Sequence, residues 1–325
     1  MESKIEVLKQ LAEELKSLAL DSDFLYRIEG QNNWFTPEFV LLSIHSITEN
    51  YLDEKALRNW LENYPIVEKD HVAIILAGNI PLVGFHDILC AYFAASRVSI
   101  KLSSKDNLLT KAVLDIWCKI DSAWAERIQI IERIEICDKI IATGSNTSYH
   151  YFELYFKKYK SILRKNRTSI AIVNKDMTEE ELNFLINDIF LYFGLGCRNV
   201  SKLWIEKGFE LSRIFEASEK YNRFFQHSKY MNNYDYQRTL LLLNRIEHLS
   251  NNFLILKPDK GLFSSISVLH YEIFEDEKEF KSDLELHKED IQCVIGRGYK
   301  PYGKGQSPQL ADYADGADTI QFLLS

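Results

Sequence analysis

Hydrophobic and polar residues follow two different patterns along the chain, and the change falls near residue 70. Before it, apolar residues recur every three to four positions, as in "TPEFVLLSIHSITENYL" at 36–52. This spacing predicts helices over residues 1–70. Thr36 and Pro37 form a helix-start signal, with Thr36 as N-cap and Pro37 in the first turn.

After residue 70, short apolar runs alternate with helical patterns. Buried strands are predicted at 71–76 ("HVAIIL"), 98–102 ("VSIKL") and 139–142 ("KIIA"), with helices at 82–95 and 108–117 between them. Strands that alternate with helices predict a parallel, doubly wound α/β layer.

The alternation resumes after Arg167. Strands are predicted at 169–173, 201–205 and 263–274, and the tail is expected to end in a short apolar strand. A helix is predicted over 179–193, opening with a capping box that begins at Thr178 and ending with Gly194 as its C-terminal cap. The second half therefore forms another α/β unit.

Charge and composition narrow the range of functions. The formal net charge of −8 argues against electrostatic binding to nucleic acid or to anionic lipid. No apolar run reaches the roughly 20 residues of a membrane span, and the charged amphipathic start lacks a signal-peptide core. Five scattered cysteines without CxxC spacing, and eight histidines without an HxxxH pair, predict no disulfide framework, no metal site and a cytoplasmic location.

One cysteine stands apart from the others. In "FGLGCRNVSKLWI" (193–205), Cys197 follows two glycines in a predicted helix-to-strand loop. It is either a small buried hydrophobe or a nucleophile, and loop access beside Arg198 favours a thiolate. The remaining cysteines, such as Cys90 and Cys118, lie within regular apolar patterns typical of a core.

The glycine-rich G-x-G-x-x-G motif that binds dinucleotides is missing. The pair Gly194 and Gly196 would need a third glycine at Asn199, and the pair at 296 and 298 would need one at Pro301. Two strand ends remain as candidates. Asn79 is either a turn residue or an amide donor, and "KLSSKD" (101–106) is either a solvated turn or a phosphate-binding segment.

Six segments together resemble one known family, from about Trp34 to the C-terminus and in the family's order. They are "AGNIPLVGFHDIL", "KLSSKDN", "ATGSNTSYHYFELYF", "LRKNRTSIAIV", "FGLGCRNVSKLWI" and "DYADGADTIQFL". They resemble the LuxC-type acyl-CoA reductases, the fatty aldehyde-forming branch of the aldehyde dehydrogenase superfamily. The resemblance implies an α/β, aldehyde dehydrogenase-like fold. Its parts are a helical segment with a Rossmann-like cofactor domain (1–165), a catalytic domain (166–310) and a tail (311–325).

The resemblance also implies roles for individual residues. Cys197 matches the nucleophile, and Asn79 matches the oxyanion-hole asparagine. Lys101 matches the lysine near the adenosine ribose, and Gly144 and Ser145 match the pair that approaches the pyrophosphate.

Cofactor choice follows from the residues after Lys101. The superfamily places an acid there that repels a 2′-phosphate, whereas this chain has Ser103, Ser104 and Lys105. Hydroxyls and lysines favour a phosphate, so the expected cofactor is NADPH.

Two departures from the superfamily concern acids. There is no Asp or Glu between Glu153 and Asp176, where oxidising members carry a water-activating glutamate, and this suits a reductase. The superfamily's glutamate near the nicotinamide ribose would fall near Gly261, where this chain has no acidic residue.

The expected activity is NADPH-dependent reduction of a long-chain acyl thioester, on CoA or a carrier, to a fatty aldehyde through an acyl-Cys197 enzyme. The alternatives are an acyl transferase or thioesterase using the same cysteine, and a non-catalytic acyl-binding scaffold. A homo-oligomer or an acyl-donor protein partner is left open.

Overall fold

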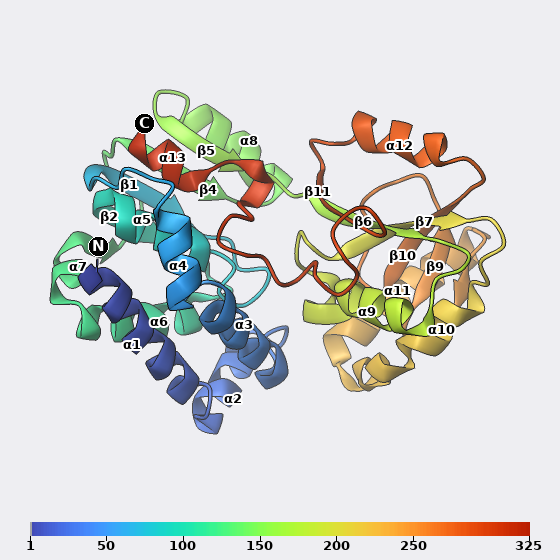
Figure 1. The fold of residues 1–325 in the computed structure, drawn as a ribbon. Helices are drawn as coiled ribbons and strands as arrows, with labels where there is room; N and C mark the ends of the chain where they lie inside the picture. Colours follow the sequence, from blue (N-terminus) through green and yellow to red (C-terminus); the bar gives the residue numbers. More distant parts are fainter. Residues whose placement is uncertain (1) are drawn as a thin grey trace. The chain divides into compact units, whose positions relative to one another are not determined.

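The computed structural model describes residues 2–325 and divides the chain into two compact α/β units (Figure 1). The first unit comprises residues up to 166 together with 308–325, and the second comprises residues 167–307. The polypeptide therefore returns to the first unit after completing the second, and the C-terminal tail packs within the first.

The N-terminal part of the first unit is helical, as predicted. Its helices are α1 (Glu2–Leu18), α2 (Ser22–Gln31), α3 (Pro37–Asn50) and α4 (Glu54–Leu61). The hydroxyl of Thr36 accepts the Phe39 N–H at the start of α3, and Pro37 occupies the first turn. The predicted N-cap is confirmed, and each helix buries one apolar face.

A five-stranded sheet forms the centre of this unit, with all strands parallel and in the order β3-β2-β1-β4-β5. The strands are β1 (Lys69–Ile75), β2 (Ala95–Lys101), β3 (Ile128–Ile130), β4 (Lys139–Thr143) and β5 (Lys160–Arg164). The helices between them are α5 (Phe85–Ala94), α6 (Asn107–Ile120), α7 (Ser122–Arg127) and α8 (Asn146–Tyr155). The three predicted strands and the Rossmann-like layer are confirmed, whereas β3 and β5 were not predicted.

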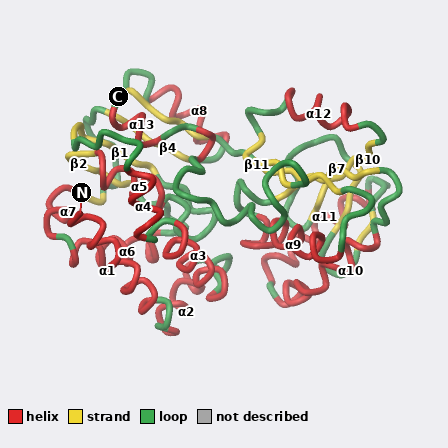
Figure 2. The backbone as a smooth tube through the Cα atoms, in the orientation of Figure 1, coloured by secondary structure: helices red, strands yellow, loops and turns green. Residues whose placement is uncertain are grey.

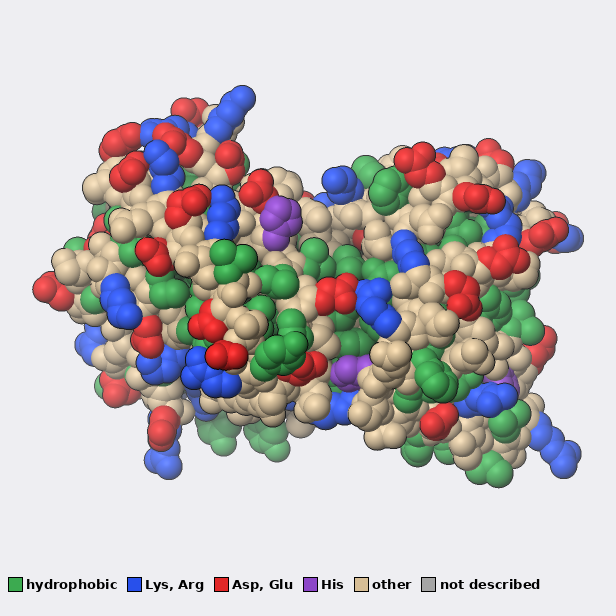
Figure 3. Space-filling view, turned by 90° about the horizontal axis from the view of Figure 1, so that it is seen from below, with side chains coloured by type: hydrophobic (Ala, Val, Ile, Leu, Met, Phe, Trp, Pro, Cys, Tyr) green, Lys and Arg blue, Asp and Glu red, His purple; other side chains and the backbone are tan. Residues whose placement is uncertain are grey.

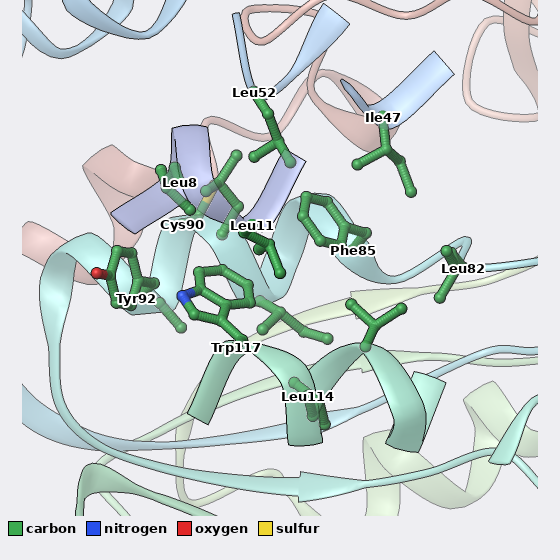
Figure 4. Close-up of a cluster of buried hydrophobic side chains, with 14 of the residues drawn as sticks. Leu8, Leu11, Ile47, Leu52, Leu82, Phe85, Cys90, Tyr92, Leu114 and Trp117 are labelled. Atoms are coloured by element: carbon green, nitrogen blue, oxygen red, sulfur yellow. The ribbon is translucent and has the colours of Figure 1, made fainter. Parts of the chain in front are cut away.

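Alternate residues of β1 enter different cores. Val72 and Ile74 join the large cluster under the N-terminal helices, α5 and α6, part of which Figure 4 shows. Ala73 joins a smaller cluster on the other face, where Phe152 of α8 also packs. Side chains alternate between the two faces of a strand, and both faces of β1 are covered. This explains why the run "HVAIIL" is almost entirely apolar.

The end of the tail is a helix, so the predicted C-terminal strand is wrong. In α13 (Thr319–Leu324), Asp318 accepts the Gln321 N–H at 2.8 Å as N-cap, and Ile320 and Leu323 are buried. The buried ammonium of Lys139 donates to the carbonyl of Leu323 at 2.8 Å. A capped turn with apolar residues three apart favours a helix, which the short apolar run alone did not reveal.

The second unit contains a six-stranded mixed sheet in the order β11-β6-β7-β10-β9-β8, with only β8 antiparallel to its neighbour. Figure 2 shows strands of this sheet, among them β7, β10 and β11, together with the helices of the unit. The strands are β6 (Thr168–Val173), β7 (Val200–Glu206), β8 (Leu249–Ser250), β9 (Ile255–Pro258), β10 (Val268–Phe274) and β11 (Ile291–Ile295). The helices are α9 (Glu179–Phe190), α10 (Ser212–Ser218), α11 (Ser228–Leu243) and α12 (Glu277–Leu286), with a 3-10 segment η2 (Glu219–Gln226).

Two boundaries in the second unit differ from the prediction. The helix expected to reach residue 193 ends at Phe190, and a short 3-10 segment η1 (Leu191–Gly194) follows. The strand expected from residue 263 begins at Val268. The capping box at the start of α9 is confirmed, since Thr178 and Glu181 exchange both hydrogen bonds.

Lys and Arg side chains are interspersed with Asp and Glu over the face shown in Figure 3. This face therefore offers no extended surface of one charge. Within residues 2–325, every helix is too short or too polar to cross a membrane.

Arg164 of β5 makes a buried ion pair with α5 and a hydrogen bond to the tail, and the ion pair generates a stability prediction. Arg164 Nη1 donates to Asp87 at 2.6 Å, and Nη2 donates to the hydroxyl of Thr319 at 3.0 Å. Asp87→Ala leaves a buried guanidinium without its counter-charge, so we expect a loss of about 3–5 kcal/mol in the free energy of unfolding. Urea titration followed by tryptophan fluorescence measures this loss.

The matched control is Asp115→Ala, which removes the partner of Lys111 in an exposed ion pair on α6. Exposed pairs contribute about 0–1 kcal/mol. Equal effects of the two substitutions would contradict a structural role for the buried pair.

Candidate functional site

Three of the predicted segments in the first unit leave the sheet at the same edge. Ile75 of β1 pairs with Lys101 of β2 on one side and with Ala142 of β4 on the other. The loop carrying Asn79, the segment from Lys101 and the pair at 144–145 therefore begin at one level, at the carboxyl ends of three adjacent parallel strands. Ligand sites of open α/β sheets gather at such an edge.

Asn79 lies half-buried in the loop between β1 and α5. Gly78, just before it, packs directly against the segment after β2, because a Cβ at this position would lie 2.4 Å from the Ser103 hydroxyl oxygen. Any larger residue would push the two segments apart. The loop that carries Asn79 (the asparagine loop) and residues 101–106 (the lysine-serine segment) therefore pack together as one surface.

The lysine-serine segment presents its polar groups to solvent. Lys101, Ser104 and Lys105 are exposed, whereas Ser103 is half-buried and its hydroxyl accepts the Lys105 N–H at 3.3 Å. Neither lysine has an ion-pair partner among the residues described. Two uncompensated cations and exposed hydroxyls can bind an anionic phosphate.

The pair Gly144 and Ser145 opens helix α8. The Ser145 hydroxyl caps the helix by accepting the Ser148 N–H at 3.2 Å. A Cβ on Gly144 would lie 2.8 Å from Cβ of Ser148, so only glycine allows this close approach. The exposed first turn offers backbone N–H groups and the positive end of the helix dipole, which favour an anion.

In the second unit, Cys197 occupies a tight turn between η1 and β7. The Asn199 N–H donates to the Gly196 carbonyl at 3.0 Å, and this bond closes the turn around the cysteine. The Cys197 carbonyl accepts the hydroxyl of Ser169, which is fully buried on β6, at 3.1 Å. The backbone of the cysteine is thus fixed to the sheet while the residue stays half-buried.

Asn199 is the centre of this turn, and sequence reasoning considered it only as a failed glycine position. Its buried side-chain oxygen accepts the Gly196 N–H at 2.8 Å. Its amide nitrogen donates to the carbonyls of Asp188, Ile189 and Leu191, at 3.0, 3.3 and 2.8 Å. The orphan carbonyls at the end of α9 are therefore satisfied by the residue that shapes the cysteine turn.

The chain reaches this turn through strained backbone. Tyr192 and Phe193 have φ values of 55° and 56°, and Gly194 continues at 74°. For residues with a side chain this conformation costs on the order of 1–2 kcal/mol each. Packing holds it, since the Phe193 ring lies 4.4 Å from that of Phe224 and 4.3 Å from the imidazole of His227, between centroids.

A buried carboxylate also secures the same end of α9. Asp188 accepts the N–H groups of Gly303 and Gly305 at 2.6 and 2.9 Å. Burial raises the pKa of Asp188 to about 6 despite these bonds. The helix end, the cysteine turn and the 303–305 loop therefore form one hydrogen-bonded network.

The other cysteines have different surroundings. Cys90, Cys137 and Cys293 are buried, and Cys118 is half-buried on α6. Burial raises the pKa values of Cys90, Cys118 and Cys137, so these thiols remain protonated. Cys293 accepts a hydrogen bond from Arg198 at 3.2 Å. The loop position of Cys197 therefore distinguishes it from the remaining four.

The two regions where the sequence lacks an expected acid contain other polar contacts. In the stretch 163–167, Arg164 is committed to Asp87. Near Gly261, the carboxylate of Asp259 accepts the Gly261 N–H at 2.7 Å, and the Gly261 carbonyl is 2.8 Å from Nδ1 of His270. An acid does lie close to Gly261, two residues earlier than the expected position.

The predicted residues thus divide between the units. Asn79, Lys101, Ser103, Ser104, Lys105, Gly144 and Ser145 lie at one edge of the first sheet, and Cys197 lies in the second unit. Within residues 2–325, no cluster of three or more His, Cys, Asp or Glu side chains could hold a metal ion.

Comparisons with known proteins give likeness in structure alone. No protein-family profile matches the chain, and neither does any curated protein sequence. Solved structures do match. AldH of Staphylococcus aureus in a substrate-bound state has a TM-score of 0.57 and 18% identity, over 87% of this chain and 73% of that one.

Two further structures are similar. Aldehyde dehydrogenase 21 from Physcomitrella patens, in complex with the reaction product succinate, has a TM-score of 0.64 at 14% identity, over 91% of this chain and 73% of that one. An NADP-dependent enzyme of E. coli has a TM-score of 0.61 at 11% identity, over 90% and 72%. The chain therefore has an α/β, aldehyde dehydrogenase-like fold.

The hydrogen bonds of Asn199 generate a prediction. Asn199→Ala leaves three carbonyls and one N–H without their partner, and each unsatisfied buried group costs about 1–3 kcal/mol. We expect the free energy of unfolding to fall by at least ~2 kcal/mol and the alkylation rate of Cys197 to rise severalfold. Urea unfolding and peptide mass spectrometry after iodoacetamide treatment measure the two effects.

Asn183→Ala is the control, because this exposed asparagine donates only to the Glu179 carbonyl of its own helix. It should change neither quantity appreciably. If Asn199→Ala leaves unfolding and alkylation unchanged, the side chain does not hold the cysteine turn.

Proposed function

We propose that this protein reduces long-chain acyl thioesters to fatty aldehydes, with NADPH as reductant and Cys197 as the covalent nucleophile. The observation that carries the proposal is the fixed, half-buried turn of Cys197 within an aldehyde dehydrogenase-like fold. The resemblance of six sequence segments to LuxC-type acyl-CoA reductases supports the choice of reaction within that fold.

The first half-reaction is acyl transfer to the enzyme. The thiolate of Cys197 attacks the carbonyl carbon of the thioester, and the carbonyl electrons move onto oxygen. We propose that Asn79 and the Cys197 N–H donate hydrogen bonds to this oxyanion. When the tetrahedral species collapses, the bond to CoA sulfur breaks, the CoA thiolate leaves, and the acyl group remains on Cys197.

The second half-reaction needs two electrons. A nicotinamide cofactor held by residues 101–105 and the start of α8 would supply these electrons as a hydride. Cys197 would carry the reduced acyl group as a thiohemiacetal anion, and cleavage of its C–S bond would release the aldehyde and restore the thiolate. The chain's own contribution is to keep water from competing. Arg164, paired with Asp87, lies in the stretch where a glutamate activates water in oxidising relatives, and the acyl-enzyme therefore lacks that base.

The groups for the cofactor lie on the first unit. The exposed lysines and hydroxyls at 101–105 suit the 2′-phosphate of the adenosine end, and the first turn of α8 with Gly144 and Ser145 suits the pyrophosphate. The similar structures include both an NADP-dependent enzyme of E. coli and an indole-3-acetaldehyde dehydrogenase in complex with NAD+, so the choice of NADPH rests on the residues at 101–105.

Covalent labelling tests the nucleophile. After incubation with myristoyl-CoA and no reductant, we expect the wild-type mass to rise by one acyl group, because the acyl-enzyme cannot be reduced. Cys197→Ala should stay unmodified. Cys118→Ala, which removes the other half-buried cysteine, should still be labelled. An adduct that persists in Cys197→Ala would overturn the assignment.

Nucleotide titration tests the cofactor. We expect NADPH to bind about tenfold or more tightly than NADH, a difference of ~1.4 kcal/mol, because the 2′-phosphate meets Lys101 and Lys105. Replacing both lysines by alanine should remove the preference. Lys111→Ala, an exposed lysine already paired with Asp115, should leave it intact. Equal affinity of the wild type for the two nucleotides would contradict the role of this segment.

A further inference from the structure

The loop that carries Asn79 is held in a conformation it would not adopt alone. Leu82 has φ 56°, a left-handed backbone that costs a leucine on the order of 1–2 kcal/mol. Two buried hydrogen bonds secure it. The hydroxyl of Ser43 donates to the Pro81 carbonyl at 2.7 Å, and the Leu82 N–H donates to Oδ2 of Asp106 at 2.8 Å. Figure 4 shows Leu82 beside the large core of this unit.

Asp106 is an unusual residue to find at this point. It stands at the N-cap position of α6, yet its side chain makes no capping hydrogen bond to the helix. Its carboxyl is 3% exposed and turned to Leu82 instead, and Oδ1 has no hydrogen-bond partner among the residues described. An aspartate kept only to begin a helix would place its oxygen on the first-turn N–H groups.

The surroundings of this carboxyl are uncharged. The Leu82 N–H donates to it from the asparagine loop, Gly78 packs against the Asp106 Cβ, and the hydroxyl and N–H of Thr110 on α6 favour its charged form. Burial among these groups raises the pKa of Asp106 to about 7. The charged neighbours on the same segment, the lysines at 101 and 105, are exposed to solvent.

We propose that Asp106 is a positioning residue that holds the Asn79 loop in place for oxyanion binding and links it to the lysine-serine segment. The proposal rests on the function proposed above for Asn79. Asp106 ends the segment that begins at Lys101, and its bond to Leu82 closes the loop three residues after Asn79. Contact between Gly78 and Ser103 closes the other side of the loop.

Removing the carboxyl should release the strain at Leu82. In Asp106→Ala the Leu82 N–H loses its acceptor, and the loop can relax to an ordinary backbone conformation. A displacement of about 1 Å at a catalytic donor can cost on the order of 10²-fold in rate. We therefore expect acyl-enzyme formation to slow by about tenfold or more.

The experiment uses the full chain and three variants. Asp106→Ala removes the acceptor, and Asp106→Asn keeps a neutral side-chain oxygen for Leu82. Asp121→Ala is the control, because it removes a carboxylate that caps α7 and binds Tyr92 elsewhere in the same unit. Amide hydrogen exchange of residues 77–84 and the rate of acylation by myristoyl-CoA are measured for each.

The expected result separates the variants. Asp106→Ala should increase exchange in 77–84 about tenfold and slow acylation, with the Kd for NADPH changed less than about threefold. Asp106→Asn should restore both properties, and Asp121→Ala should alter neither. Faster exchange with slower acylation in Asp106→Ala alone supports the proposal.

A pH series tests whether the Asp106 carboxyl itself stabilises the loop. The folded-state pKa of Asp106 is raised to about 7, above its ordinary value, so stabilisation is greatest at low pH and is lost as pH rises through 7. Loop protection in the wild type, corrected for intrinsic exchange, should therefore fall as pH rises from about 4 to about 7 and level off above that. Asp106→Asn has no proton to lose there and should show no such fall.

Two outcomes would overturn the proposal. In the first, Asp106→Ala has the same loop exchange and acylation rate as the wild type. In the second, Asp121→Ala changes both quantities as much as Asp106→Ala does. If the wild type forms no acyl-enzyme at all, the proposed function fails. Loop exchange in Asp106→Ala and Asp106→Asn then decides alone whether Asp106 holds the loop.

Discussion

Parallel pairing of β1 with its two neighbours is the constraint on which the candidate site of the first unit depends. Because Ile75 aligns with both Lys101 and Ala142, three connecting segments leave the sheet at one level. An asparagine amide, two uncompensated lysines and a helix N-terminus are thereby gathered from residues as far apart in the chain as Asn79 and Ser145. None of these groups would form a site without the register of the sheet.

In the second unit, hydrogen bonding to backbone takes the place of sheet register. Asn199 and Ser169 fix the turn around Cys197 from both sides, and packing of Phe193 compensates for the strained approach. Asp106 and Asn199 serve similar ends, since each is a buried polar side chain that satisfies backbone groups of a loop bearing a candidate reactive residue. Rigid support of this kind suits a site that stabilises developing charge.

Much of this architecture was predictable, because it rests on local signals. The apolar runs at β1 and β6 are buried on both faces, and Thr36 and Thr178 cap their helices as their sequences indicate. β3 and β5 were missed because one has only three residues and the other begins and ends with charged residues. The tail was misread because a six-residue helix and a short apolar strand have similar composition.

The sequence indicated candidate residues but not the contacts that support them. Cys197 and Asn79 stand out beside glycine or proline, whereas the partners of Asn199 and Asp106 depend on contacts between distant turns. The left-handed backbone at Tyr192 and Phe193 also depends on tertiary packing, since neither residue favours it. Sequence patterns therefore indicate candidate reactive groups, and the fold determines what holds them.

The central claim is that the acyl group on Cys197 is reduced rather than hydrolysed or transferred. The most direct measurement is the stoichiometry of a single reaction mixture of the full chain, myristoyl-CoA and NADPH. The account predicts equal amounts of CoA thiol released, NADPH oxidised and fatty aldehyde formed. Release of CoA without NADPH oxidation and without aldehyde would contradict it, and would identify the chain as a thioesterase or acyl transferase.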